Sequence, residues 1–281
     1  MKNLLVVGGT GFIGRNICNY AVSNKWNVTS IARTKNKNVE KNITCDLSTN
    51  KANIIEPYDL IIHTAGASNK NNRDPECYKS NLSVTENLVK SIPSDFNGKI
   101  IFLSGISVYN NTKTRIITEN THAENPDSYS LSKLQSEVLL KKSPFRTLVL
   151  RIPAVLGTGA PTSWPVRLKN DKRLGKLIKI YNPLNKYNHC IDVNALIEFI
   201  FSSTVLSKYS NNIFDSILLG SDSPITILES ANIIIGDYNN VKNIDTNQKD
   251  RIIDFSKSKL EYGYQPLTVK TTLENYVSCN Q

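Results

Sequence analysis

The feature that most constrains the fold of this 281-residue chain is a glycine-rich segment near its start, Gly8-Gly9-Thr10-Gly11-Phe12-Ile13-Gly14. A short apolar run, Leu4–Val7, precedes it, and apolar residues at helical spacing follow it to about Val22. Glycines at these positions allow a tight turn, a close approach of the backbone to a pyrophosphate, and close packing of the helix on the strand. The segment therefore predicts a strand, a loop and a helix that together bind a dinucleotide, with the helix N-terminus facing the phosphates.

The alternation of strands and helices continues to about residue 155. Buried strands are predicted at Val28–Ala32, Ile43–Cys45, Leu60–Thr64, Ile100–Leu103 and Thr147–Ile152. Helices are predicted near residues 75–92 and 128–140. Strands separated by helices of this length imply right-handed crossovers, so the predicted fold is α/β with a Rossmann-type doubly wound parallel sheet.

The pattern changes in the last part of the chain, where Gly and Pro residues mark loops and short strands lie between helical stretches. We predict a dinucleotide-binding domain over residues 1–155 and a smaller substrate-binding lobe over residues 156–281. Because no linker separates the two halves, the lobe is expected to be interleaved with the sheet and not to form an independent domain.

Charge and composition exclude several classes of partner. The net charge is +10, but the basic residues are dispersed and none of the basic runs is interleaved with aromatics, so no nucleic-acid partner is expected. No run approaches the ~18 apolar residues of a membrane span, and no signal peptide is recognisable. The five cysteines lack metal-ligand spacing. We expect a cytoplasmic protein with reduced thiols, no metal and no membrane partner; a homodimer is left open.

The spacing GxxGxxG of the first loop resembles the short-chain dehydrogenase/reductase family, and GGTGFIG is similar to its extended branch, which modifies nucleotide sugars. The resemblance extends to Asp46-Leu47 after the third strand and to the fourth strand with its following residues, Asp59–Ala67. It implies that the cofactor is contacted by Gly8, Thr10, Gly11, Phe12, Ile13, Gly14, Asp46, Leu47, Thr64, Ala65, Gly66 and Asn81. Ala67 is expected beside the substrate.

The end of the second strand bears on the choice of cofactor. An Asp or Glu at this position accepts hydrogen bonds from the ribose hydroxyls of NAD. The segment Ile31–Lys35 contains no acid, and Arg33 can pair with a 2′-phosphate instead. NADP is therefore the expected cofactor, with NAD as the alternative.

Tyr129 and Lys133 lie four residues apart, on one face of a predicted helix. A phenol has an unperturbed pKa of about 10 and is a poor proton donor or acceptor at neutral pH unless a nearby cation stabilises the phenolate. In the family that the sequence resembles, the lysine of this YxxxK pattern also holds the nicotinamide ribose, and the tyrosine exchanges a proton with a substrate oxygen. The two residues are the expected catalytic and cofactor-binding pair.

A third catalytic residue of that family, a Ser or Thr at the end of the fifth strand, is not found at its usual place. Aligned on Val108-Tyr109, the position falls on Gly105. Ser104 and Ser107 flank it and are the catalytic candidates, with Ser107 preferred and also expected to contact the substrate. The acidic pair that follows this position in dehydratases is absent as well, which disfavours dehydration.

The sixth strand and the segment after it complete the predicted site. Leu150–Gly157 resembles the family's segment that crosses the nicotinamide, which implies that Ile152 and Pro153 contact the cofactor. The basic residues after Gly159 suit a substrate pyrophosphate, and Arg167 is the candidate substrate residue among Arg167, Lys169, Lys172 and Arg173. The sequence thus predicts an NADP-dependent reductase of a 4-keto nucleotide sugar. An NAD-dependent nucleotide-sugar epimerase and a non-catalytic NADP-binding protein are the alternatives.

Overall fold

The computed structural model describes residues 2–67, 75–110, 112–207, 213–246 and 248–279. The chain forms two compact units and passes between them several times. Unit 1 consists of Met1–Thr112, His122–Arg151 and Phe201–Ile217, and unit 2 consists of Lys113–Thr121, Ile152–Ile200 and Leu218–Gln281. The boundary at residue 155 stays a prediction.

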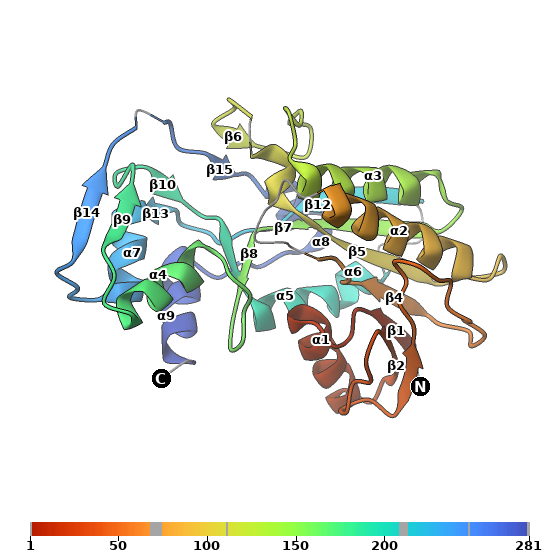
Figure 1. The fold of residues 1–281 in the computed structure, drawn as a ribbon. Coiled ribbons are helices and arrows are strands. Elements are labelled where there is room, and N and C mark those ends of the chain that lie inside the picture. The colour runs from red at the N-terminus through yellow and green to blue at the C-terminus, as the bar shows by residue number, and fades with distance from the viewer. Residues whose placement is uncertain (1, 68–74, 111, 208–212, 247, 280–281) are drawn as a thin grey trace. The chain divides into compact units, whose positions relative to one another are not determined.

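A seven-stranded sheet forms the centre of unit 1 (Figure 1). Its order is β12-β7-β5-β4-β1-β2-β3, and the neighbouring pairs from β5 to β3 run parallel. The strands are β1 (Asn3–Val7), β2 (Asn27–Ala32), β3 (Lys41–Thr44), β4 (Leu60–His63), β5 (Lys99–Gly105), β7 (Arg146–Ile152) and β12 (Phe214–Leu218). This order confirms the predicted doubly wound α/β fold. The sequence pattern did not predict that β12, from the last third of the chain, would form an edge of the sheet.

Helices cover the sheet, so its inner strands are apolar on both faces. Leu4 to Val7 of β1 and Ile61 and Ile62 of β4 have no exposed surface. The main helices of unit 1 are α1 (Phe12–Ser23), α2 (Pro75–Ser91) and α3 (Ser128–Lys142); short turns form η1 (Ile106–Tyr109) and α6 (Ser203–Ser207). Helices α2 and α3 lie side by side (Figure 1). Helix α3 begins after Asp127, whose side chain accepts a 2.8 Å hydrogen bond from Ser130 N.

Unit 2 has its own apolar core, formed mainly by α4, α7, α9 and β9. Its helices are α4 (Trp164–Arg173), α5 (Val193–Ile200), α7 (Ile227–Ile235), α8 (Ser256–Tyr262) and α9 (Val269–Ser278). Its strands pair two by two: β8 (Ala154–Leu156) with β11 (Cys190–Asp192), β9 (Ile178–Tyr181) with β14 (Val241–Ile244), β6 (Ile116–Ile117) with β15 (Ile252–Ile253), and β10 (Lys186–Tyr187) with β13 (Ile225–Thr226). Across the part of the chain that is described, no helix is both long and apolar enough to cross a membrane.

Candidate active site

A cavity of about 390 Å³ opens in unit 1 at the carboxyl ends of β1, β2 and β4. This edge of a parallel sheet is where ligands of doubly wound folds bind. The cavity collects most of the residues that the sequence predicted for the cofactor, together with Ala67: Gly8, Thr10, Gly11, Arg33, Asp46, Leu47, Thr64, Ala65, Gly66, Ala67 and Asn81. Phe12, Ile13 and Gly14 lie in the first turn of α1 and do not line it.

The glycine loop packs so closely against its neighbours that side chains at Gly8 and Gly14 would clash with the backbone. Gly8 has a φ of +86°, and a Cβ atom there would lie 2.8 Å from the backbone N of Ala65. A Cβ atom on Gly14 would lie 2.2 Å from the carbonyl oxygen of Gly8. The residue before α1 is Gly11, so no side chain caps the first N–H groups of the helix. Helical N–H groups without a side-chain cap, beside a loop of three glycines and Thr10, fit a pyrophosphate.

Arg33 and Asp46 line the same cavity from neighbouring strand ends. Oδ1 of Asp46 accepts hydrogen bonds from Ser48, 2.6 Å from its Oγ and 2.9 Å from its N. These hydrogen bonds, and after them the positive charge of Arg33, lower the pKa of Asp46. Asp46 is thus held as a fixed carboxylate, and Arg33 brings a cation to this end of the cavity.

Asn81 of α2 fixes the chain where it leaves β4. Its Oδ1 accepts a 2.7 Å hydrogen bond from Ala67 N, and its Nδ2 donates to Ala67 O at 3.0 Å and to Ser132 Oγ at 3.2 Å. The Asn81 side chain is 5% exposed. Asn81 therefore connects the loop after β4, which lines the cofactor cavity, to α3, the helix that carries Tyr129 and Lys133.

Lys133 is buried between α3, β5 and this loop, with 5% of its surface exposed. Its Nζ donates a 3.1 Å hydrogen bond to the carbonyl oxygen of Leu103 and lies 5.8 Å from the centre of the Tyr129 ring. A Cβ atom on Gly66 would lie 3.0 Å from the same Nζ. The ammonium group is thus close both to the phenol and to the backbone that lines the cofactor cavity.

The two candidate serines have different surroundings. Ser104 Oγ donates a 2.6 Å hydrogen bond to Glu137 of α3. Glu137 also forms a buried ion pair with Arg151, at 2.6 Å, and Arg151 donates to the hydroxyl of Tyr109. The Ser104 hydroxyl is therefore engaged in a network that joins β5, α3, β7 and η1.

Ser107 lies beside Tyr129. If Gly105 carried a Cβ atom, it would be 3.2 Å from Ser107 Oγ and 3.9 Å from Cε1 of Tyr129. Ser107 Oγ is buried and has no hydrogen-bond partner among the residues that are described. The two candidates thus differ in the structure, since the Ser104 hydroxyl donates to Glu137 and the Ser107 hydroxyl has no partner among the described residues.

Sequence reasoning missed two polar contacts that support the site. Nδ2 of the buried Asn36 donates a 2.8 Å hydrogen bond to the carbonyl oxygen of Gly9, behind the glycine loop. On β4, His63 is fully buried, with its Nε2 3.0 Å from the hydroxyl oxygen of Thr85. Burial, and after it the charge of Lys133, lower the pKa of His63 to about 3. No local pattern marks Asn36, because its partner is 27 residues away.

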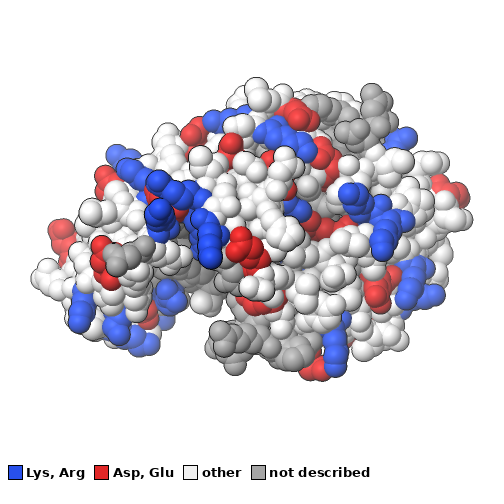
Figure 2. Space-filling model, turned by 90° about the horizontal axis from the view of Figure 1, so that it is seen from above, with Lys and Arg blue, Asp and Glu red and all other residues white. Residues whose placement is uncertain are grey.

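The remaining predicted residues belong to unit 2. Ile152 and Pro153 are buried at the end of β7 and do not line the cofactor cavity. Arg167, on α4, lines a separate cavity of about 280 Å³ together with Trp164, Tyr187, His189, Lys186 and Arg251. Figure 2 shows a dense group of Lys and Arg side chains toward the left of the view, the side where Figure 1 places β9, β10 and β14. The lining of the Arg167 cavity combines cations and aromatic rings with the carboxylate of Asp250.

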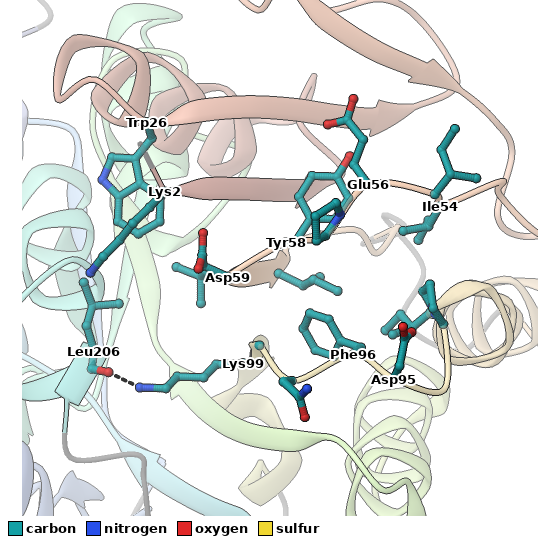
Figure 3. A pocket seen from close by; sticks show the side chains of 18 residues that line it. Lys2, Trp26, Ile54, Glu56, Tyr58, Asp59, Asp95, Phe96, Lys99 and Leu206 are labelled. Carbon is teal, nitrogen blue, oxygen red and sulfur yellow. Dashed lines mark hydrogen bonds between the residues drawn. The ribbon is translucent and has the colours of Figure 1, made fainter.

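A larger cavity, of about 630 Å³, lies at the opposite edge of the unit 1 sheet, by the amino ends of β1, β4 and β5 (Figure 3). Trp26, Tyr58 and Phe96 line it, and Lys99 donates a hydrogen bond to the carbonyl oxygen of Leu206. None of the predicted site residues lines it. We therefore place the candidate active site at the carboxyl edge, despite the smaller volume of the cavity there.

Two proteins of known activity are similar to this chain in sequence. Sterol-4-alpha-carboxylate 3-dehydrogenase, decarboxylating, from Dictyostelium discoideum is 27% identical over 181 residues, which are 56% of this chain and 55% of that protein. The match thus spans about half the length of this relative. GDP-6-deoxy-D-talose 4-dehydrogenase from Aggregatibacter actinomycetemcomitans is 28% identical over 205 residues, 68% of each chain.

Solved structures share the fold over the whole chain. A UDP-galactose 4-epimerase has a TM-score of 0.80 at 16% identity, covering 99% of this chain and 98% of that one. The UDP-glucuronic acid 4-epimerase of Bacillus cereus, solved with NAD, has a TM-score of 0.79 at 21% identity, with the same coverage. The profile of the NAD dependent epimerase/dehydratase family matches residues 4–202. The chain belongs to this family, and so to the oxidoreductase-type enzymes of the extended short-chain dehydrogenase/reductase family.

Proposed function

We propose that the chain is an NADP-dependent oxidoreductase that reduces the 4-keto group of a nucleotide sugar. The observation that carries this proposal is the position of Lys133, whose ammonium is close to the ring of Tyr129 and to Gly66 of the cofactor cavity. One cation can then hold the cofactor ribose and stabilise the phenolate. Arg33, in the same cavity, supports NADP over NAD because a guanidinium pairs with a 2′-phosphate.

The residues of the cavity fit a dinucleotide, and different residues would bind its different parts. The loop from Gly8 to Gly11 and the first turn of α1 would bind the pyrophosphate, and Arg33 would bind the 2′-phosphate. When bound, the reduced nicotinamide would supply a hydride to the carbonyl carbon of the substrate. Tyr129 donates its phenolic proton to the carbonyl oxygen, Lys133 stabilises the resulting phenolate, and a proton from solvent restores the phenol. The net change is ketone, NADPH and one proton to alcohol and NADP⁺.

The substrate class is supported by the sequence relative and by unit 2. The bacterial relative is named as a 4-dehydrogenase of a GDP-sugar, which is redox chemistry at the same sugar carbon. The cavity around Arg167, Lys186 and Arg251 offers cations for a diphosphate, and Trp164 and Tyr187 offer apolar rings for a base. The sterol dehydrogenase relative names a different substrate, so a sterol is the competing candidate.

Net reduction is preferred over dehydration because of the residues that follow β5. Dehydratases of this family carry an acidic pair just after the position of Gly105, and this chain has Ile106 and Ser107 there. Without those acids, no side chain at these positions can remove or deliver the second proton that loss of water requires.

The test is to incubate the purified chain with NADPH and a panel of UDP-, GDP- and dTDP-linked 4-keto sugars, following NADPH absorbance and the sugar product. One NADPH consumed per sugar reduced supports the proposal. Inversion at C4 of nucleotide sugars that carry a C4 hydroxyl, tested in parallel without added NADPH, would identify an epimerase instead. Tight NADPH binding with no turnover on the panel, or on a 3-keto sterol used as the control substrate, would identify a non-catalytic binding protein.

A further inference from the structure

The end of β5, next to Tyr129, carries a glycine that its backbone conformation does not require. Gly105 has φ −127° and ψ 145°, which is ordinary extended backbone that any residue adopts. The neighbour that a Cβ atom would meet first is the hydroxyl oxygen of Ser107, at 3.2 Å. The space that a side chain at position 105 would enter is thus restricted by the hydroxyl of Ser107.

The Ser107 hydroxyl is buried, yet it lacks a hydrogen-bond partner in the part of the chain that is described. Buried polar atoms in native proteins are nearly always paired, so an orphaned hydroxyl calls for an explanation such as a bound ligand. Its neighbours point to the substrate, because the space beside it is bounded by the ring of Tyr129, whose Cε1 would be 3.9 Å from a Cβ atom on Gly105.

The backbone of Ser107 is fixed to the helix turn that carries Tyr129. Its carbonyl oxygen accepts a 3.0 Å hydrogen bond from the hydroxyl of Ser130 and a 2.9 Å bond from Asn110 N. Ser130 follows Tyr129 directly in α3. These hydrogen bonds therefore fix the position of Ser107 relative to Tyr129. Two groups that donate to one oxygen atom must be fixed in this way.

We propose that Ser107 supplies, from η1, the hydroxyl that binds the substrate oxygen together with Tyr129, in place of a side chain at the end of β5. This inference rests on the proposed function. Ser107 donates a hydrogen bond to the carbonyl oxygen and transfers no proton, because the proton comes from Tyr129. Ser104 does not take this role, since its hydroxyl donates to Glu137 at 2.6 Å.

The inference predicts that the hydroxyl can be moved back to β5. In Ser107→Ala, loss of one donor to the reacting oxygen should lower turnover about 10²–10³-fold. In Gly105→Ser with Ser107→Ala, the 3.2 Å contact no longer exists, and the new serine carries a hydroxyl at the end of β5, beside Tyr129. This double variant should recover at least about tenfold of the lost turnover, because it restores a donor to the substrate oxygen.

Gly105→Ala with Ser107→Ala is the matched control, since it adds the same Cβ atom without the hydroxyl. NADPH dissociation constants and thermal midpoints should be alike in all these variants, which excludes a general loss of folding. If Ser107→Ala turns over the substrate as fast as the wild type, this inference is wrong. It is also wrong if the alanine control recovers as much turnover as Gly105→Ser with Ser107→Ala. In either case the proposed function still holds. No wild-type turnover on any keto sugar would overturn the proposed function, and this inference with it.

Discussion

Lys133 Nζ donates a 3.1 Å hydrogen bond to the carbonyl oxygen of Leu103, so a main-chain group of β5 fixes the ammonium nitrogen below the ring of Tyr129. A backbone carbonyl carries no formal charge, so this hydrogen bond positions the ammonium group without cancelling its positive charge. Mutations of Tyr129 and of Lys133 should therefore have different effects on turnover and on cofactor binding.

Tyr129→Phe removes the transferable proton and little else. Because general acid catalysis contributes about 10²–10⁴-fold, turnover should fall by that order while the NADPH dissociation constant stays almost unchanged. Lys133→Met should weaken NADPH binding as well as turnover, since one ammonium serves both. Turnover and NADPH binding, measured for both variants, test this difference; near-normal turnover in Tyr129→Phe would remove Tyr129 from the mechanism.

Arg33→Ala should change the cofactor preference. A charge-assisted hydrogen bond contributes roughly 1.5–3 kcal/mol, so NADPH should bind about tenfold or more weakly in this variant. NADH, which has no 2′-phosphate, should bind nearly as it does to the wild type. Dissociation constants from fluorescence titrations of both cofactors decide the matter, and an equal loss for the two would contradict the role of Arg33.

The ion pair between Glu137 and Arg151 should matter for stability because both side chains are buried, 6% and 12% exposed. Arg151→Met leaves the Glu137 carboxylate buried without its cation, which costs about 3–5 kcal/mol. Lys79→Ala is the control, since its pair with Glu76 is exposed and contributes at most about 1 kcal/mol. The free energy of unfolding from urea titrations measures both; equal small losses would show that the buried pair is dispensable.

One fully buried histidine, His63, and one partly buried histidine, His189, should make the fold sensitive to acid. Burial, and after it nearby cations, lower the pKa of His63 to about 3 and that of His189 to about 4. The unfolded chain, with histidine pKa values near 6.5, then binds more protons below that pH. Stability is thus fully present above about pH 6.5 and falls as the pH drops toward the folded values, by about 2 kcal/mol per histidine at pH 5.

Unfolding free energies measured between pH 7 and pH 5 test this expectation. His63→Gln and His189→Gln should each make the pH dependence shallower, although both can lower the stability at pH 7. An unchanged slope in these two variants would show that neither histidine opposes protonation in the folded state.

The sequence by itself determined the features that depend on neighbours along the chain. The glycine loop between β1 and α1 could be predicted because a strand, a tight turn and a helix follow one another within about 20 residues. The spacing of Tyr129 and Lys133 places them on one face of α3 through the period of the helix alone. The parallel sheet followed from strands that alternate with helices.

The tertiary structure decided what depends on residues far apart in the chain. The sequence preferred Ser107 to Ser104 but could not show that Glu137, 33 residues from Ser104, accepts a hydrogen bond from the Ser104 hydroxyl. The hydrogen bond from Asn36 to Gly9 and the pairing of β12 with β7 likewise could not be predicted from any local sequence pattern. The physical reason is that hydrogen bonds and strand pairing depend on distance in space, whereas periodicity and spacing report only the few residues on either side.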